Sequence, residues 1–139
     1  MNYEYTVEIN ADAAKVWEIL HDVERWPEWT TSMTSVEVLD KPLAVGSRVK
    51  IKQPKLRPAT MTVSSLDHNK SFSWTSDSPG MHSEADHEIA SSSSGSTVTL
   101  RFALTGAIGS VAGLFYGSLI KRYVETEGNG LKARAEGSE

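Results

Sequence analysis

The sequence predicts an α+β fold in which a curved antiparallel sheet packs around a long C-terminal helix. Between residues 35 and 104, short segments with period-2 alternation are separated by turn residues, as expected for strands joined by hairpins. After Gly106 the apolar residues recur three and four positions apart, which is typical of one face of a helix. One sheet with its helices gathered on one face is the architecture that satisfies both patterns.

The elements are expected in the order strand, two short helices, six strands and long helix. Asp12 offers an N-cap for the first helix, and Pro27 interrupts the helical pattern that follows. Trp26 and Trp29 beside this proline indicate a second short helix or turn, with the tryptophans serving either as an anchor or as part of an entrance lid. Strands are expected at residues 3–9, 35–39, 47–53, 60–66, 71–75, 81–90 and 97–104, and the long helix from Ala107 to about residue 135.

Length and composition limit the classes of protein to consider. The 139 residues suit a single domain, residues 1–139. The absence of cysteine excludes disulfides, thiolate metal sites and cysteine nucleophiles. A net charge of −4 argues against a nucleic-acid partner, which needs a basic stripe. No basic segment followed by an apolar run opens the chain, so a cytoplasmic location is expected.

The longest uncharged apolar segment runs from Gly106 to Ile120. It is shorter than the roughly 20 residues that span a bilayer. We therefore expect a buried helix here and no transmembrane segment. Gly109, Gly113 and Gly117 recur every four residues in it, a spacing that allows either close packing of another backbone or room for a ligand.

Strand parity predicts which side chains face the long helix, because successive residues of a strand point to opposite faces. In the strand at 47–53, Arg48, Lys50 and Lys52 fall on the outer face. The candidate ligand-binding residues combine inward positions of the sheet with two residues of the helix: Val49, Ile51, Gln53, Met61, Val63, Phe72, Trp74, Met81, Ser83, Ala85, His87, Phe115 and Tyr116.

Three polar residues, Gln53, Ser83 and His87, fall on the inner face among apolar neighbours. An apolar wall with a few convergent polar groups is what orients a small molecule. His87 is the best catalytic candidate, as a hydrogen-bond partner of a ligand or a general acid or base; the alternative is that it satisfies a buried structural partner. Gln53, beside Pro54, is either a strand-end residue or a ligand contact.

No metal or cofactor motif occurs. The four histidines lack HxH or HxxxH spacing, and His82 and His87, five residues apart in one strand, point to opposite faces. There is no GxSxG, P-loop or GxGxxG segment, so neither nucleophile-elbow hydrolysis nor nucleotide binding is supported. We expect no metal and no cofactor.

Several segments resemble those of one superfamily. They are Ala14–Trp17 in the first helix, the Asp22–Trp29 segment DVERWPEW, Gly46–Val49, Gln53-Pro54, Phe72-Ser73-Trp74 and the terminal GLKARAE. In these the chain resembles the START-like (SRPBCC) superfamily, and within it the polyketide cyclase/dehydrase-like branch. The resemblance implies a helix-grip fold, with seven strands gripping the C-terminal helix around a cavity. It implies no single activity, because members include lipid carriers, plant hormone and allergen-type binders, aromatase/cyclases and hydrophobic-ligand chaperones.

Three functions remain open at this point. The leading hypothesis is a binder or carrier of a hydrophobic small molecule, lipid-like or aromatic and polyketide-like. The second is a cofactor-free polyketide cyclase or dehydratase, in which His87 moves protons while Gln53 or Tyr116 holds a carbonyl. The third is an interaction module with a collapsed pocket. No two carboxylates converge on one apolar face by strand parity, so the sequence itself favours binding over catalysis.

Overall fold

The computed structural model describes residues 1–137 and has the predicted fold. One sheet of seven antiparallel strands has the order β1-β7-β6-β5-β4-β3-β2. The elements are β1 (Asn2–Ile9), α1 (Ala13–His21), the 3-10 helix η1 (Val23–Glu28), β2 (Ser35–Val38), β3 (Arg48–Lys52), β4 (Ala59–Asp67), β5 (Ser71–Ser78), β6 (Met81–Ser92), β7 (Gly95–Thr105) and α2 (Ala107–Gly137). The α+β helix-grip prediction is thus confirmed.

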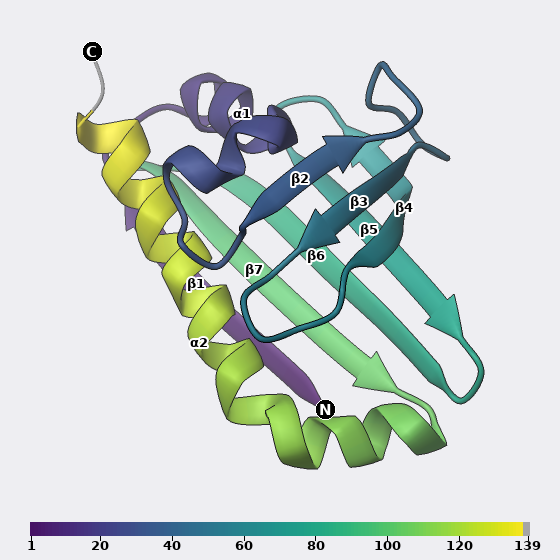
Figure 1. Cartoon of the computed structure of the whole chain (residues 1–139). Coiled ribbons are helices and arrows are strands. Elements are labelled where there is room, and N and C mark those ends of the chain that lie inside the picture. The colour runs from purple at the N-terminus through teal and green to yellow at the C-terminus, as the bar shows by residue number, and fades with distance from the viewer. Residues whose placement is uncertain (138–139) are drawn as a thin grey trace.

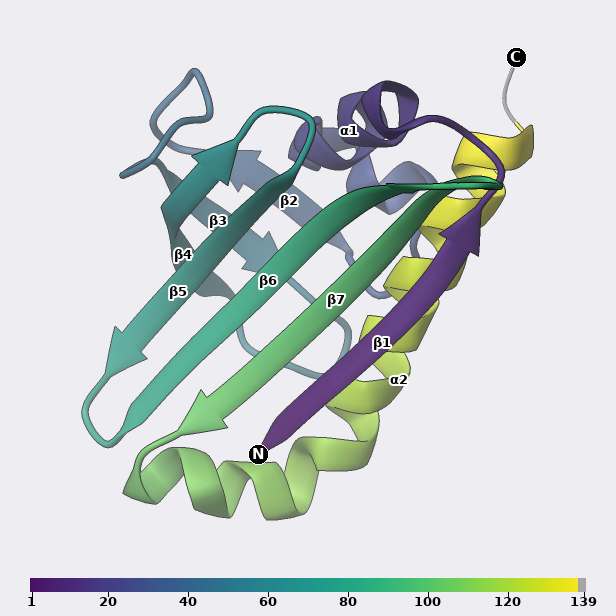
Figure 2. The ribbon, with the colours of Figure 1, turned by 180° about the vertical axis from the view of Figure 1, so that it is seen from behind.

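The sheet is strongly curved, and its hollow side holds the helices. Figure 1 shows β2 and β3 folded over in front of β6 and β7, with α2 running along the open side of the curve. The helices α1 and η1 cover one end of this hollow. Seen from behind, in Figure 2, the outer faces of β1, β7, β6 and β5 carry no helix. The inside of the curve is therefore where a core and a cavity can form.

The core occupies the end covered by α1 and η1. The Asp12 side chain caps α1 by accepting a hydrogen bond of 2.9 Å from the backbone N–H of Lys15. Trp26 of η1 is fully buried, and its Nε1 donates to the carbonyl oxygen of Leu20 at 2.9 Å. A tryptophan with its ring buried and its N–H satisfied acts as an anchor, so the lid interpretation is wrong for Trp26.

The strand parity inferred from the sequence is confirmed by burial. In β3, Val49 and Ile51 are buried while Arg48 and Lys50 are exposed. Among the strands, β5 extends furthest beyond one end of its expected range of 71–75, since it continues to Ser78. Its hairpin with β6 therefore turns at Pro79 and Gly80 alone.

The expectation of a buried helix at Gly106–Ile120 is wrong. Figures 1 and 2 show that α2 first crosses the end of the sheet and then bends to run along it. Gly117 and Ser118 lie in this first part, and Gly/Ser pairs are frequent places for helix kinks. Gly113 and Gly117 pack against Met1, which favours close packing over room for a ligand. Because the first part leaves the hollow, its large apolar side chains are exposed: Ile108, Val111, Leu114, Phe115 and Tyr116.

Candidate functional site

A cavity of about 220 Å³ lies between the sheet and the middle of α2, at the end of the hollow that α1 and η1 leave uncovered. The sheet supplies its floor and α2 one wall, while the loop between β3 and β4 forms part of the rim. Its lining residues are Met33, Ile51, Gln53, Leu56, Ala59, Met61, Trp74, Ser76, Met81, Ser83, Ala85, Asp86, His87, Leu100, Arg101, Phe102, Leu104, Ile120, Tyr123, Val124 and Glu127.

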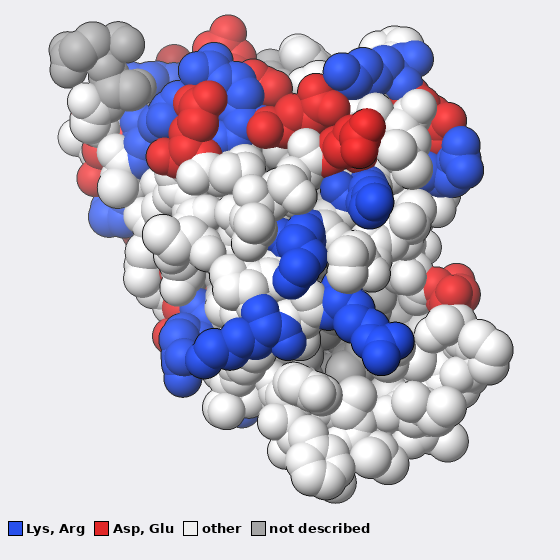
Figure 3. Space-filling view, viewed as in Figure 1, with Lys and Arg blue, Asp and Glu red and all other residues white. Residues whose placement is uncertain are grey.

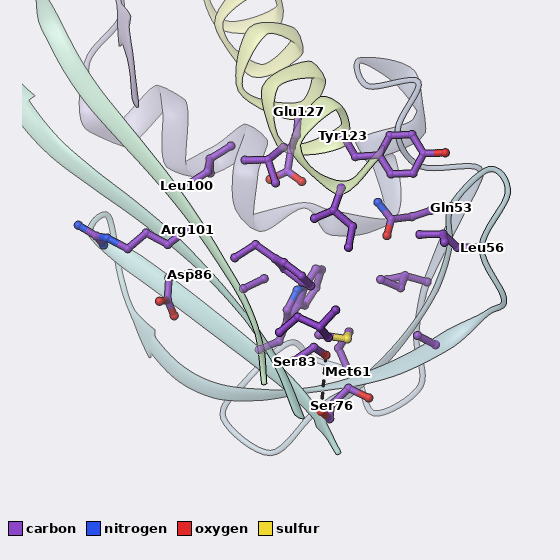
Figure 4. A pocket seen from close by; sticks show the side chains of 18 of the residues that line it. Gln53, Leu56, Met61, Ser76, Ser83, Asp86, Leu100, Arg101, Tyr123 and Glu127 are labelled. Carbon is purple, nitrogen blue, oxygen red and sulfur yellow. Dashed lines mark hydrogen bonds between the residues drawn. The ribbon is translucent and has the colours of Figure 1, made fainter. Parts of the chain in front are cut away.

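Most of the sheet residues selected by parity lie at this cavity. Those that line it are Ile51, Gln53, Met61, Trp74, Met81, Ser83, Ala85 and His87. In Figure 4, Gln53 points into the space from the rim, and Met61 and Ser83 lie on the floor. The Ser83 hydroxyl donates to the carbonyl oxygen of Ser76 at 3.5 Å, a long bond that leaves the hydroxyl free to turn toward a ligand. Whether any of these residues binds a ligand stays a prediction.

The remaining candidates lie elsewhere, for two physical reasons. Val49, Val63 and Phe72 face inward as predicted, but α1 and η1 fill that half of the hollow, and Phe72 packs edge-on against Trp17 with ring centres 6.4 Å apart. Phe115 and Tyr116 do not close the cavity, because the bend in α2 turns them outward; their exposed fractions are 79% and 47%. Their assignment as cavity residues is corrected accordingly.

His87 lies where the aromatic core meets the cavity. Its ring stacks on Phe72 with centres 4.2 Å apart and lies edge-on to Trp26 and Trp74. Its Nδ1 lies 3.1 Å from the carbonyl oxygen of Phe72. A carbonyl only accepts hydrogen bonds, so this contact assigns a proton to Nδ1 and leaves Nε2 as the atom that faces the cavity.

Glu127 of α2 is the partner that sequence reasoning missed. One of its carboxylate oxygens, Oε2, lies 3.4 Å from His87 Nε2, and only 12% of its side chain is exposed. This distance is longer than the roughly 2.7–3.2 Å of a well-formed hydrogen bond, so the pair can admit a third polar group. The helical spacing of Ile120, Val124, Glu127 and Leu131 indicates that Glu127 lies on the same helix face as these apolar residues. A glutamate in a charged stretch, however, is usually interpreted as solvent-exposed.

The rim is held together by contacts between α2 and the loop after β3. The Tyr123 hydroxyl donates to the carbonyl oxygen of Pro54. Lys52 donates through Nζ to the carbonyl oxygens of Gln53, at 2.7 Å, and Leu56. Figure 4 shows Tyr123 and Glu127 reaching from the helix and Leu56 from the loop, while Arg101 and Asp86 point away from the cavity. The polar side chains of His87, Glu127, Gln53 and Ser83 thus line a space whose other lining residues are mostly apolar.

Among residues 1–137, no group of three or more His, Asp or Glu side chains is placed to hold a metal ion. His82 lies on the outer face beside Asp77 and Glu84, away from His87. In the same part of the chain, no helix is long and apolar enough to cross a membrane.

Comparison with known proteins identifies the family. The family model for polyketide cyclase/dehydrase and lipid transport proteins matches residues 1–136. The chain belongs to this family. The resemblance noted in the sequence is thus confirmed over nearly the whole chain. No functionally curated protein matches the sequence.

Solved structures of the same fold cover nearly the whole chain. The TTHA0849 protein of Thermus thermophilus is 15% identical with a TM-score of 0.80, and 97% of each chain is covered. The KanY protein (ms6282) is 23% identical with a TM-score of 0.77 and coverage of 99% and 98%. The Zhui aromatase/cyclase from Streptomyces sp. R1128 is 18% identical with a TM-score of 0.74 and coverage of 97% and 93%. At these sequence identities, the structural likeness shows that this member of the polyketide cyclase/dehydrase family shares their fold.

Proposed function

We propose that this protein binds a hydrophobic small molecule that carries one polar group, such as a carbonyl, in the cavity between sheet and α2. The observation that carries the proposal is the buried His87–Glu127 pair at the edge of an otherwise apolar cavity. Apolar walls supply affinity by removing ligand surface from water, and a single polar pair fixes the ligand's orientation. The family description, which covers both cyclase/dehydrases and lipid transport, is compatible with this function.

The size of the cavity narrows the ligand class. Its volume of about 220 Å³ is below the ~300–1,000 Å³ of sites for drug-sized ligands. A compound of one or two fused rings, or a short acyl chain, therefore fits this form better than a complete two-chain lipid. The interaction-module hypothesis depended on a collapsed pocket. The cavity is open, so this observation does not support that hypothesis.

Titration calorimetry with methyl naphthyl ketone tests the proposal, alongside native mass spectrometry to detect a co-purified hydrophobic compound. Ala85 lines the cavity, so Ala85→Leu fills part of it and should abolish ketone binding. Thr62→Leu adds the same side chain on the exposed outer face of β4 and is the matched control. Binding that survives Ala85→Leu unchanged places the ligand elsewhere and contradicts the proposal.

A second candidate function is a cofactor-free cyclase or dehydratase, and the His87–Glu127 pair favours it. Such chemistry begins when a base removes a proton from a carbon beside a carbonyl. His87 Nε2 faces the cavity as a base, and Glu127 can stabilise the imidazolium that forms. Hydrogen–deuterium exchange at the central methylene of benzoylacetone measures this step by NMR. Exchange accelerated by the wild type and lost in His87→Phe supports catalysis; exchange at the buffer rate leaves binding as the function.

A further inference from the structure

The first part of α2 presents an apolar surface that the fold leaves uncovered. Ile108 and Val111 are more than half exposed, and Leu114 and Phe115 are exposed by 86% and 79%. No charged residue occurs from Gly106 to Ile120. Single exposed apolar side chains are ordinary, but a contiguous group of this kind marks a binding surface.

Basic residues without acidic partners gather beside this segment. Lys121 and Arg122 follow it directly in α2, and β3 with its following loop adds Lys50, Lys52, Lys55 and Arg57. Within residues 1–137, none of these forms a salt bridge. By contrast, most other cations of the chain are paired with a carboxylate: Arg25, Lys41, Arg48, Arg101, Lys132 and Arg134. In a chain of net charge −4, this is a local concentration of unneutralised positive charge.

The two features lie on one face of the molecule. Figure 3 shows basic side chains across the middle of this face and an end without charged side chains below them, where Figure 1 places the first part of α2. We propose that this end docks on an anionic lipid membrane. The apolar segment inserts among the acyl chains, and the basic residues lie against the headgroups.

The shape of the apolar segment favours lipid over a protein surface. Leu114 and Tyr116 are two positions apart and so lie about 200° apart around the helix axis, yet both are exposed. A fluid acyl layer can surround such a helix, whereas a flat partner covers one side of it. A second copy fits less well, because a two-fold interface repeats the same patch on both subunits and brings the unneutralised basic residues together.

The position of this surface relates it to the cavity. Met81, Ser83 and Ile120 line the cavity and are half-buried, so the cavity opens toward this end. Met81 also packs against α2 at Gly109, where an added Cβ would lie 3.4 Å from Met81 Cγ. Docking through α2 therefore brings the open end of the cavity near the lipid surface. The docking itself does not depend on the cavity binding a ligand.

Vesicle co-sedimentation tests the proposal. The wild type should bind vesicles of equimolar phosphatidylcholine and phosphatidylglycerol, and bind vesicles of phosphatidylcholine alone much more weakly. The double variant Leu114→Ser/Phe115→Ser should lower the partition coefficient on anionic vesicles by ten-fold or more, since it removes two large apolar side chains that insertion would withdraw from water. Lys121→Glu/Arg122→Glu should lower it by about five-fold or more for each charge removed, and added salt should weaken wild-type binding.

Matched controls come from exposed residues at the opposite end of the molecule from the first part of α2 (Figure 1). Val45→Ser removes a side chain exposed by 63% from the loop between β2 and β3. Lys70→Glu reverses a charge in the turn between β4 and β5. Both should bind vesicles as the wild type does. The proposal is overturned if the wild type does not sediment with anionic vesicles, or if the serine variant binds them unchanged. The proposal is also overturned if the serine variant binds vesicles as the wild type does, while sedimentation equilibrium shows that it has lost a dimer or an acidic protein partner.

Discussion

His87 Nε2 on β6 and Glu127 Oε2 on α2 lie 3.4 Å apart, and both side chains are largely shielded from water. The pair joins the sheet to the long helix across the inner end of the cavity. Because Nδ1 donates to the carbonyl of Phe72, the ring has one fixed orientation, and Nε2 is directed at the carboxylate. We therefore expect both the stability of the fold and the orientation of a bound ligand to depend on these two residues. Unfolding and ligand-binding measurements distinguish the two contributions.

The first prediction is that His87 and Glu127 are energetically coupled. His87→Phe keeps the stacking on Phe72 but leaves the Glu127 carboxylate without its partner, and Glu127→Leu does the converse to His87. Each single change should lower the free energy of unfolding by about 1–3 kcal/mol. The double variant should lose less than the sum of the two, because an apolar pair leaves no isolated buried charge. Urea denaturation of all four proteins measures the coupling; additive losses would show that the residues act independently.

The second prediction concerns the polar group of the ligand. Methyl naphthyl ketone and ethylnaphthalene have nearly the same shape, but only the ketone accepts a hydrogen bond. A ketone and an ionised carboxylate only accept hydrogen bonds, so the donor has to be a proton shared between His87 Nε2 and Glu127. With this proton donated to the ketone oxygen, the wild type should bind the ketone more tightly by roughly 1 kcal/mol, about five-fold. His87→Phe should remove this difference and leave the affinity for ethylnaphthalene nearly unchanged. If the preference for the ketone persists in His87→Phe, His87 has only a structural role.

The third prediction is that Gly130 is required by a close approach between α2 and η1. A Cβ at this position would lie 2.1 Å from the carbonyl oxygen of Trp29, a backbone atom that cannot turn aside. Gly130→Ala should therefore destabilise the protein by about 1–3 kcal/mol, although alanine favours helices by about 1 kcal/mol. Gly117→Ala in the same helix is the control, because its Cβ meets only Met1 Sδ at 3.8 Å and Met1 Cε at 4.0 Å. It should raise the melting temperature, and a similar rise for Gly130→Ala would contradict the packing argument.

The sheet could be predicted from the sequence because strand parity is a local property. Once β3 was placed, Ile51 had to point inward and Lys50 outward, and the same reasoning turned His87 toward the helix. Half of the hollow is nevertheless filled by α1 and η1, and no alternation in β5 distinguishes Phe72 in the core from Trp74 at the cavity. That division depends on contacts between elements distant in the sequence.

The helix was harder to predict because apolar residues surround its first part. Periodicity placed Phe115 on the inner face, but the bend in α2 turns Phe115 outward. The inner face of the second part includes Glu127, whose charge suggests an exposed position. Only the pairing of this carboxylate with His87 explains its burial, and a pairing across 40 positions is not visible in local patterns.

The last prediction concerns the acid stability that Glu28 of η1 contributes. Hydrogen bonds from Arg25 and from Arg134 of α2 lower the pKa of Glu28 from its ordinary 4.5 to about 2. A carboxyl group whose pKa is lower in the folded state stabilises it fully above pH 4.5, and this contribution disappears as the pH falls toward 2. Glu28→Gln should therefore be less stable than the wild type at pH 6 and approach it near pH 2. Denaturation across this range, repeated for Arg134→Gln and the double variant, separates the link to α2 from the local pair with Arg25. A stability difference between wild type and Glu28→Gln that stays constant with pH would show that the carboxylate's charge is not what links η1 to α2.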